Sequence, residues 1–384
     1  MEKTPQEIVA SIDDLLTEIL IRLPLKSLFR FKQVSKHWQS LITDPGFAIR
    51  RNPISKPVGM FVPRCMNKTT FSRFAYVPFS NKKPKTRHVK QLDDVKIINS
   101  CNGLLLCYRN LTNSISYLVY NPTTNKSSTI PDDGVQSNVL GMSLAFDPAR
   151  SRHYKIVRVR GVFVVDIFEY RIEVYLSESG CWRKPDGPFR ALVNFSDGVY
   201  WNGAIHWVNY KTRDCLYFNP NDDDRMVMPR MAPSLPSSSV EHKRFYFGES
   251  CGHLNYVEFL RPGVCSKVYE LRRDYSEWFF KYNFDLLIIY RGVDYMKSYE
   301  NELWWSCKFS SIIVVRGEKD EDSFIVFIYS GKIVVRYNFV QGTCEMIGGE
   351  VVDYEKKRFY DKLSFSQGFQ YIESLCAINT NSSD

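Results

Sequence analysis

The stretch that decides the fold is residues 11–42, SIDDLLTEILIRLPLKSLFRFKQVSKHWQSLI, which predicts three short helices. Ser11 is the expected N-cap of the first helix, with Asp14 in the place of a capping-box acid. Pro24 ends this helix and suits the first turn of the second. Asp44-Pro45-Gly46 is expected to end the run. The first helix presents apolar residues at helical spacing: Ile12, Leu15, Leu16, Ile19, Leu20 and Leu23.

The apolar surface of this stretch is large for its length. A domain of roughly 40 residues is at the limit of independent folding. Three such short helices cannot enclose all of these side chains among themselves, so part of the surface should face another element or another protein. Aliphatic anchors with one Trp are typical of the centre of an interface. The alternative is that the helices pack on the rest of their own chain.

The same residues resemble an F-box, the segment by which substrate receptors of SCF-type ubiquitin ligases bind the Skp-type adaptor and, through it, a cullin. The matching residues are Asp14-Leu15-Leu16, Ile19-Leu20, Leu23-Pro24, Lys26-Ser27-Leu28, Val34-Ser35-Lys36, Trp38 and Leu41-Ile42. One position departs from the family, which usually opens with Leu-Pro where this chain has Ser11-Ile12. We expect weaker adaptor binding from this change, not its loss, because Ile12 keeps an apolar group there.

The resemblance implies an adaptor-binding face. Its expected residues are Ile12, Leu15, Leu16, Ile19, Leu20, Leu23, Pro24, Leu28, Val34, Trp38 and Leu41. Trp38 is expected to be partly core and partly in direct contact with the adaptor. No residue is assigned to target binding.

From about residue 96 the sequence becomes a series of short strands. Runs rich in Val, Ile, Tyr and Phe alternate with turns, and no strong helix is expected; Leu286–Tyr290 and Ile312–Val315 have strand length. Similar segments recur: Ser100-Cys101-Asn102-Gly103, Trp201-Asn202-Gly203 and Ser250-Cys251-Gly252. Gly203 and Gly252 lie 49 residues apart, a period typical of four-stranded propeller blades. We therefore predict a β-propeller of about six blades, with a pair of β-sandwiches as the alternative.

The domain organisation follows from these patterns. We predict a helical F-box module at residues 1–50, a connecting segment with short strands and a basic loop at 51–95, and the β domain at 96–384. A strand at 369–375 is expected to close the ring by pairing with strands near residues 60–77. The segments Asn102-Gly103-Leu104-Leu105, Tyr120-Asn121-Pro122-Thr123, Phe146-Asp147-Pro148 and Gly203-Ala204-Ile205-His206-Trp207 resemble the kelch-like F-box-associated domain of plant F-box proteins.

One motif suggests catalysis. Gly248-Glu249-Ser250-Cys251-Gly252 fits G-x-S-x-G, the nucleophile turn of α/β-hydrolases. No helix pattern follows it, and the only later histidine is His253, three residues after the serine. The near-repeat at residues 100–103 indicates a strand connection instead. We expect no catalytic residue, and tryptophans 182, 201, 207, 304 and 305 are expected to pack between blades.

Composition limits the remaining classes. The 384 residues carry a net charge of +9, with one basic run at residues 82–90 that we interpret as a solvated loop. The histidines and ten cysteines show no metal-ligand spacing, and the acidic segments 222–224 and 318–322 lack EF-hand spacing. We expect no metal, cofactor, nucleic-acid or membrane partner, and a protein of the cytoplasm or the nucleus without a secretory signal.

Three functions are compared. The first is a non-catalytic substrate receptor of an SCF-type ligase that holds a target near the charged ubiquitin carrier and so raises the effective concentration of the acceptor lysine. The second is a scaffold without ubiquitylation, and the third is a serine hydrolase using Ser250. The sequence argues against the hydrolase and does not separate the receptor from the scaffold.

Overall fold

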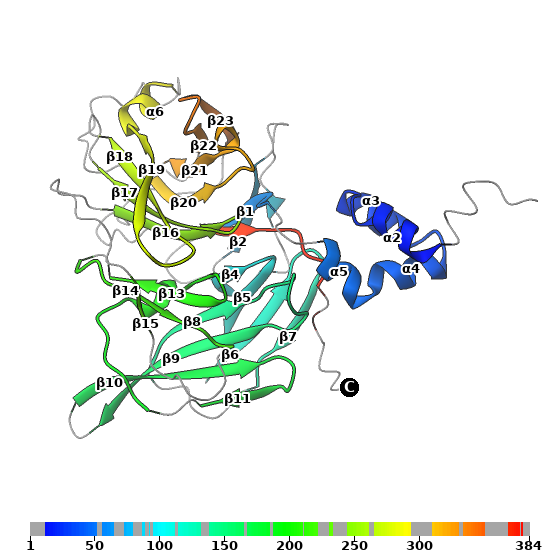
Figure 1. Ribbon diagram of the computed structural model, residues 1–384, viewed down its shortest axis with the longest axis horizontal. Helices are drawn as coiled ribbons and strands as arrows, with labels where there is room; N and C mark the ends of the chain where they lie inside the picture. Colours follow the sequence, from blue (N-terminus) through cyan, green and yellow to red (C-terminus); the bar gives the residue numbers. More distant parts are fainter. Residues whose placement is uncertain are drawn as a thin grey trace, which may run out of the picture.

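The computed structural model places six four-stranded antiparallel sheets in a ring, with a group of helices on one side (Figure 1). It describes residues 12–51, 56–64, 73–79, 87–88, 92, 95–111, 114–131, 138–164, 167–184, 187–209, 211–221, 230–232, 244–260, 265–292, 309–329, 333–349, 368–376 and 378. The prediction of a small helical module followed by a propeller of about six blades is confirmed.

Each blade is a meander of four strands. Blade 1 contains β24 (Phe369–Tyr371), β1 (Gly59–Arg64), β2 (Arg73–Pro78) and β3 (Arg87–His88). Blade 2 contains β4 (Lys96–Cys101), β5 (Leu104–Asn110), β6 (Ile115–Asn121) and β7 (Lys126–Thr129). Blade 3 contains β8 (Val139–Ala145), β9 (Lys155–Val164), β10 (Ile167–Leu176) and β11 (Cys181–Arg183).

The second half of the ring repeats this plan. Blade 4 contains β12 (Val199–Trp201), β13 (Ala204–Val208), β14 (Cys215–Phe218) and β15 (Arg230–Ala232). Blade 5 contains β16 (Arg244–Ser250), β17 (His253–Phe259), β18 (Ser266–Leu271) and β19 (Trp278–Phe284). Blade 6 contains β20 (Phe309–Val315), β21 (Phe324–Tyr329), β22 (Ile333–Asn338) and β23 (Cys344–Gly349).

The core lies between the blades, because strands such as β13 and β21 are buried on both faces. In β20, Ile312 and Val314 pack toward blade 5, whereas Ile313 and Val315 pack toward blade 1. This alternation has the period of two that a strand requires. One blade alone would expose both of its apolar faces, so the blades are stable only as a ring.

The repeated sequence segments are equivalent hairpins. Asn102-Gly103, Asn202-Gly203 and Cys251-Gly252 join the first two strands of blades 2, 4 and 5, and all six residues have positive φ. Asn-Gly is the strongest sequence signal for such a two-residue turn. Blade 3 has a longer connection between β8 and β9, which is why its sequence gives only a partial repeat.

The C-terminal strand closes the ring as predicted, although it ends at Tyr371 and not at residue 375. β24 pairs antiparallel with β1, with Gly59 opposite Tyr371 and Phe61 opposite Phe369. The strands predicted within residues 51–95 are present and form blade 1 with β24. The following residues pass close to Gly103, where an added Cβ would lie 2.5 Å from the Cβ of Ser374. The contact therefore requires glycine both for space and for its φ of 91°.

The predicted strand at Leu286–Tyr290 is wrong. This run lies in the helix α6 (Leu286–Gly292). Asp285 accepts a hydrogen bond from the backbone N–H of Leu287 at 2.8 Å and so begins the helix. Leu286 and Ile289 are buried while Ile288 is exposed, which is helical and not alternating periodicity.

Residues 12–51, the described part of the N-terminal module, form one helix more than predicted. α2 (Asp13–Leu20), α3 (Leu25–Phe31) and α4 (Lys36–Thr43) match the three expected helices, and α5 (Pro45–Arg51) follows. Asp44 does not end the run, because its side chain accepts a hydrogen bond from the backbone of Gly46 and opens α5. Ile12 occupies the N-cap position of α2 without a side-chain bond, and the predicted cap Ser11 lies outside the described residues. No helix in the described ranges is long and apolar enough to cross a membrane.

Candidate partner-binding surfaces

The helical module has its own small core. Its buried residues come from all four helices: Leu16, Leu20, Leu25, Leu28, Ile42 and Phe47. Two polar contacts join the helices outside this core, an ion pair from Arg50 to Glu18 at 2.6 Å and a contact between His37 Nε2 and Asp13 Oδ1 at 3.1 Å. The module is thus held together from within, which leaves the outer side of α2 uncovered.

The apolar residues of α2 divide into two rows. Leu16 and Leu20 point inward and are at most 3% exposed. Ile12, Leu15 and Ile19 point outward and are 42%, 47% and 48% exposed. The apolar face predicted from the sequence is therefore wider than the part of it that the core buries. We call Ile12, Leu15 and Ile19 the outer row, which is free to bind a partner.

The eleven predicted adaptor-binding residues fall into three groups. Ile12, Leu15, Ile19, Pro24 and Val34 are exposed; Leu23, Trp38 and Leu41 are half-buried; Leu16, Leu20 and Leu28 are core residues. We call the exposed residues, together with Phe29, the outer apolar face. Phe29 was not among the predicted residues, although it is 38% exposed and lies one position after Leu28 in the motif.

Trp38 joins the core to this surface. Its ring meets that of Phe31 edge-on at 5.2 Å between centroids, and it packs against the core while remaining half-buried. Ser35 fixes the start of α4, because its hydroxyl accepts a hydrogen bond from the Trp38 backbone N–H at 3.1 Å. Trp38 is therefore partly in the core, and its predicted contact with the adaptor stays a prediction.

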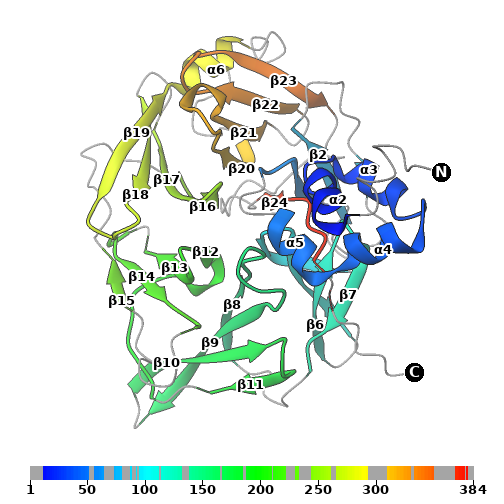
Figure 2. The ribbon, with the colours of Figure 1, turned by 45° about the vertical axis from the view of Figure 1, so that its right-hand side comes forward.

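The C-terminal segment links the module to the propeller. Leu375 packs against the helical core, and the Asn121 side chain donates to the carbonyls of Ser374 and Cys376 at 3.1 and 2.9 Å. The hydroxyl oxygens of Thr123 and Tyr371 share a hydrogen bond of 2.8 Å just before this segment. In Figure 2 the helices lie in front of blades 1 and 2, and Figure 1 shows α5 next to the point where this segment leaves the ring, with α2–α4 farther from the propeller. The C-terminal segment thus contacts both the helices and the ring.

The G-x-S-x-G segment is not a nucleophile site. Ser250 is buried at the end of β16, and its hydroxyl accepts a hydrogen bond from the Arg316 backbone N–H at 3.0 Å. His253 is bound instead to Glu270, with 2.6 Å between Nδ1 and the carboxylate. The segment runs from strand to strand, as its repeat with residues 100–103 predicted, and no strand-to-helix turn is formed.

The substitution Ser250→Ala is expected to be mild. It removes the acceptor of one buried backbone N–H, which costs about 1–3 kcal/mol. Adaptor capture should stay unchanged, because the helical module does not contact Ser250. A thermal melt and an adaptor pull-down measure both effects; loss of ubiquitylation of a captured protein without unfolding would restore the hydrolase hypothesis.

The predicted tryptophans have three outcomes. Trp201 and Trp207 are buried between blades, as expected. Trp182 is half-buried and lies over the Arg158 guanidinium at 3.9 Å. Residues 304 and 305, and the side chains of the basic run at 82–90, lie outside the described residues. Within the described part of the chain, no group of three or more His, Cys, Asp or Glu side chains could hold a metal ion.

Comparison with known proteins agrees with this architecture. The F-box domain family matches residues 13–50, and the family of the F-box associated beta propeller domain matches residues 68–223. F-box protein At5g07610 of Arabidopsis thaliana is 33% identical over 97% of this chain and 93% of its own length. F-box/kelch-repeat protein At3g17530 of the same plant is 26% identical, over 60% of this chain and 62% of its own length. The helices, the ring and this similarity together show that the chain belongs to the plant F-box proteins with an F-box-associated β-propeller domain.

Proposed function

We propose that this protein is the substrate-recognition subunit of an SCF-type ubiquitin ligase. Its F-box would bind a Skp-type adaptor, and its propeller would hold the target. The proposal that the F-box binds an adaptor rests on one observation. The outer row, Ile12, Leu15 and Ile19, is not covered by any other described part of the chain. Exposed aliphatic residues in a contiguous row are typical of a protein interface.

The proposed contribution to the reaction is positional. The chain would supply no reacting group; binding would raise the local concentration of a target lysine near the ubiquitin carrier. The contacts of Leu375 and Asn121 support this role, because they fix the propeller relative to the helices. A loose connection would spread the same target over a larger volume and lower the effective concentration.

The test replaces two residues of the outer row. Leu15→Asp with Ile19→Asp should lower capture by a recombinant Skp-type adaptor at least about 100-fold, because two unpaired charges would be buried on binding. Both side chains are about half exposed in the free chain, so the melting temperature should change little. Affinity measurement and a thermal melt on the same preparation separate the two effects.

The control is Ile288→Asp, which puts one such charge on an exposed aliphatic residue of α6 in the propeller. Capture should be unaffected by this change. Unaltered capture by the double variant would remove the outer row from the interface.

A second experiment separates the receptor from the scaffold. Partners of the wild type and of the Leu15→Asp, Ile19→Asp variant are captured from plant cells with the proteasome inhibited. For a receptor, ligase subunits should be lost from the variant, while targets should remain and carry less ubiquitin. Retained partners whose ubiquitin content is the same with both proteins would favour the scaffold.

A further inference from the structure

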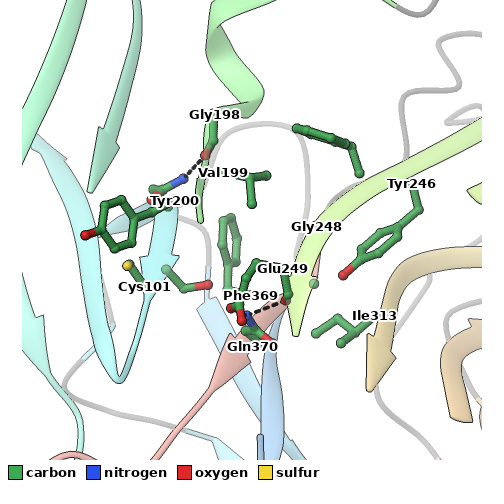
Figure 3. Close-up of a pocket in the computed structure, with 14 residues that line it drawn as sticks. Cys101, Gly198, Val199, Tyr200, Tyr246, Gly248, Glu249, Ile313, Phe369 and Gln370 are labelled. Atoms are coloured by element: carbon green, nitrogen blue, oxygen red, sulfur yellow. Dashed lines mark hydrogen bonds between the residues drawn. The ribbon is translucent and has the colours of Figure 1, made fainter. Parts of the chain in front are cut away.

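A narrow cavity lies at the centre of the propeller. It is lined by the innermost strands of blades 2, 4, 5, 6 and 1, and Figure 3 shows the side chains that surround it. Its volume is about 60 Å³. Since one water needs roughly 10–15 Å³ on this measure, the space holds about four waters. This is room for the end of one side chain and too little for a helix or a folded loop.

The wall of this cavity carries one formal charge. Among the described residues that line it, Glu249 alone is acidic and none is basic. The remaining wall is neutral and partly apolar, with Val199, Ile313 and Phe369 on three different strands. A phosphate or carboxylate would meet repulsion here, whereas a cation would meet a counter-charge and an apolar wall for its stem.

The polar groups at the cavity are acceptors with spare capacity. One Glu249 oxygen accepts the Gly252 N–H at 2.7 Å, and the other has a long contact of 3.4 Å from Gln370 Nε2. Gln370 Nε2 also donates to the Glu249 carbonyl at 2.9 Å, and Figure 3 shows the two side chains next to each other. The Gln370 Oε1 atom is buried and has no hydrogen-bond partner in the structure. Two acceptors thus lack a good donor.

The carboxylate of Glu249 is destabilised where it lies. Burial raises its pKa to about 7, against the opposing effects of the Gly252 N–H, the Gln370 amide and the His253 charge. The other titratable groups that interact with it are Cys101, Cys251 and Tyr246. His253, which is itself bound to Glu270, has the smallest of these opposing effects. A cation entering the cavity would relieve this cost.

We propose that the central cavity binds the cationic end of a lysine or arginine side chain of the target, with Glu249 as counter-charge. This inference rests on the proposed function, because it names what the propeller recognises. The rival explanation is structural: Glu249 would serve only to join β16 to β24 at ring closure.

The test uses pools of labelled heptapeptides with random flanks and one fixed central residue: lysine, norleucine, arginine or citrulline. The full chain should retain the lysine or the arginine pool at least about tenfold more than its neutral counterpart. Glu249→Gln should abolish this preference, because it keeps the shape and one oxygen that can accept the Gly252 N–H, but it loses the charge. Glu178→Gln, an exposed carboxyl in the β10–β11 turn, makes the same net-charge change away from the cavity and should leave the preference intact.

A pH series adds a second readout. Retention of the cationic pools should rise between pH 6 and 8 in the wild type as Glu249 ionises, and it should be much flatter in Glu249→Gln, which keeps His253. Equal retention of charged and neutral pools, or a preference that survives in a folded Glu249→Gln protein, would overturn the proposal. If Glu249→Gln lowers the melting temperature markedly, Glu249→Asp replaces it, with a weakened preference expected. Adaptor capture does not depend on these variants, so failure here is distinct from failure of the ligase assignment.

Discussion

A chain that ends at Gly368 is expected to lose the cooperative unfolding of the propeller. The truncation removes β24, so blade 1 loses its innermost strand and β1 its hydrogen-bonded neighbour. It also removes three buried apolar residues beyond the strand, Ile372, Cys376 and Ile378. Each buried apolar side chain contributes about 1.5–3 kcal/mol, and whole domains are stable by only about 5–15 kcal/mol. The loss is therefore comparable to the whole stability of the ring.

The matched control ends at Ile378 and keeps all of these contacts. Calorimetry of the two proteins should show a cooperative transition for the longer chain and a broad or absent one for the shorter chain. Limited proteolysis should cut the shorter chain throughout the propeller, because an open ring exposes blade faces and strand edges. Identical melting curves would show that β24 contributes little to closure.

How far the sequence predicted the fold depends on how local each signal was. The three hairpins at residues 102–103, 202–203 and 251–252 have positive φ, which favours Asn and Gly. Because these turns recur at the same place in the blades, the sequence repeats with the period of the blades. The closing strand was predictable because a ring needs a partner for β1. α6 was missed because a run of five apolar residues suits a strand or a helix equally, and the preceding Asp285 was not interpreted as a cap.

The site was predicted less completely. The F-box residues were found, but their division into inner and outer rows depends on Ile42 and Phe47, which fill the core from other helices. Helical periodicity alone cannot say how much of an apolar face a neighbour covers. Glu249 was present in the sequence as the second residue of G-x-S-x-G. Its position in the central cavity follows only once the ring brings β4, β16 and β24 together.

The two rows of α2 predict opposite effects of the same substitution. Leu20→Ala should lower the stability of the helical module by about 2–5 kcal/mol, because Leu20 is fully buried and the change leaves a cavity. Leu15→Ala should change stability by less than about 0.5 kcal/mol, since its side chain is half exposed. The two variants should rank the other way in adaptor binding, measured at a temperature where the helical modules of both are folded. Leu15→Ala should weaken capture directly, whereas Leu20→Ala should weaken it only through unfolding.

Hydrogen exchange read by mass spectrometry distinguishes these outcomes. Peptides from α2 to α5 should exchange faster in Leu20→Ala and at the wild-type rate in Leu15→Ala, while propeller peptides stay unchanged in both. A module of about 40 residues has little stability to spare, so a loss of this size should appear as exchange through unfolding of the four helices together. If Leu15→Ala accelerated exchange as much as Leu20→Ala, the outer row would belong to the core, and the surface assigned to the adaptor would have to be sought on α3 and α4.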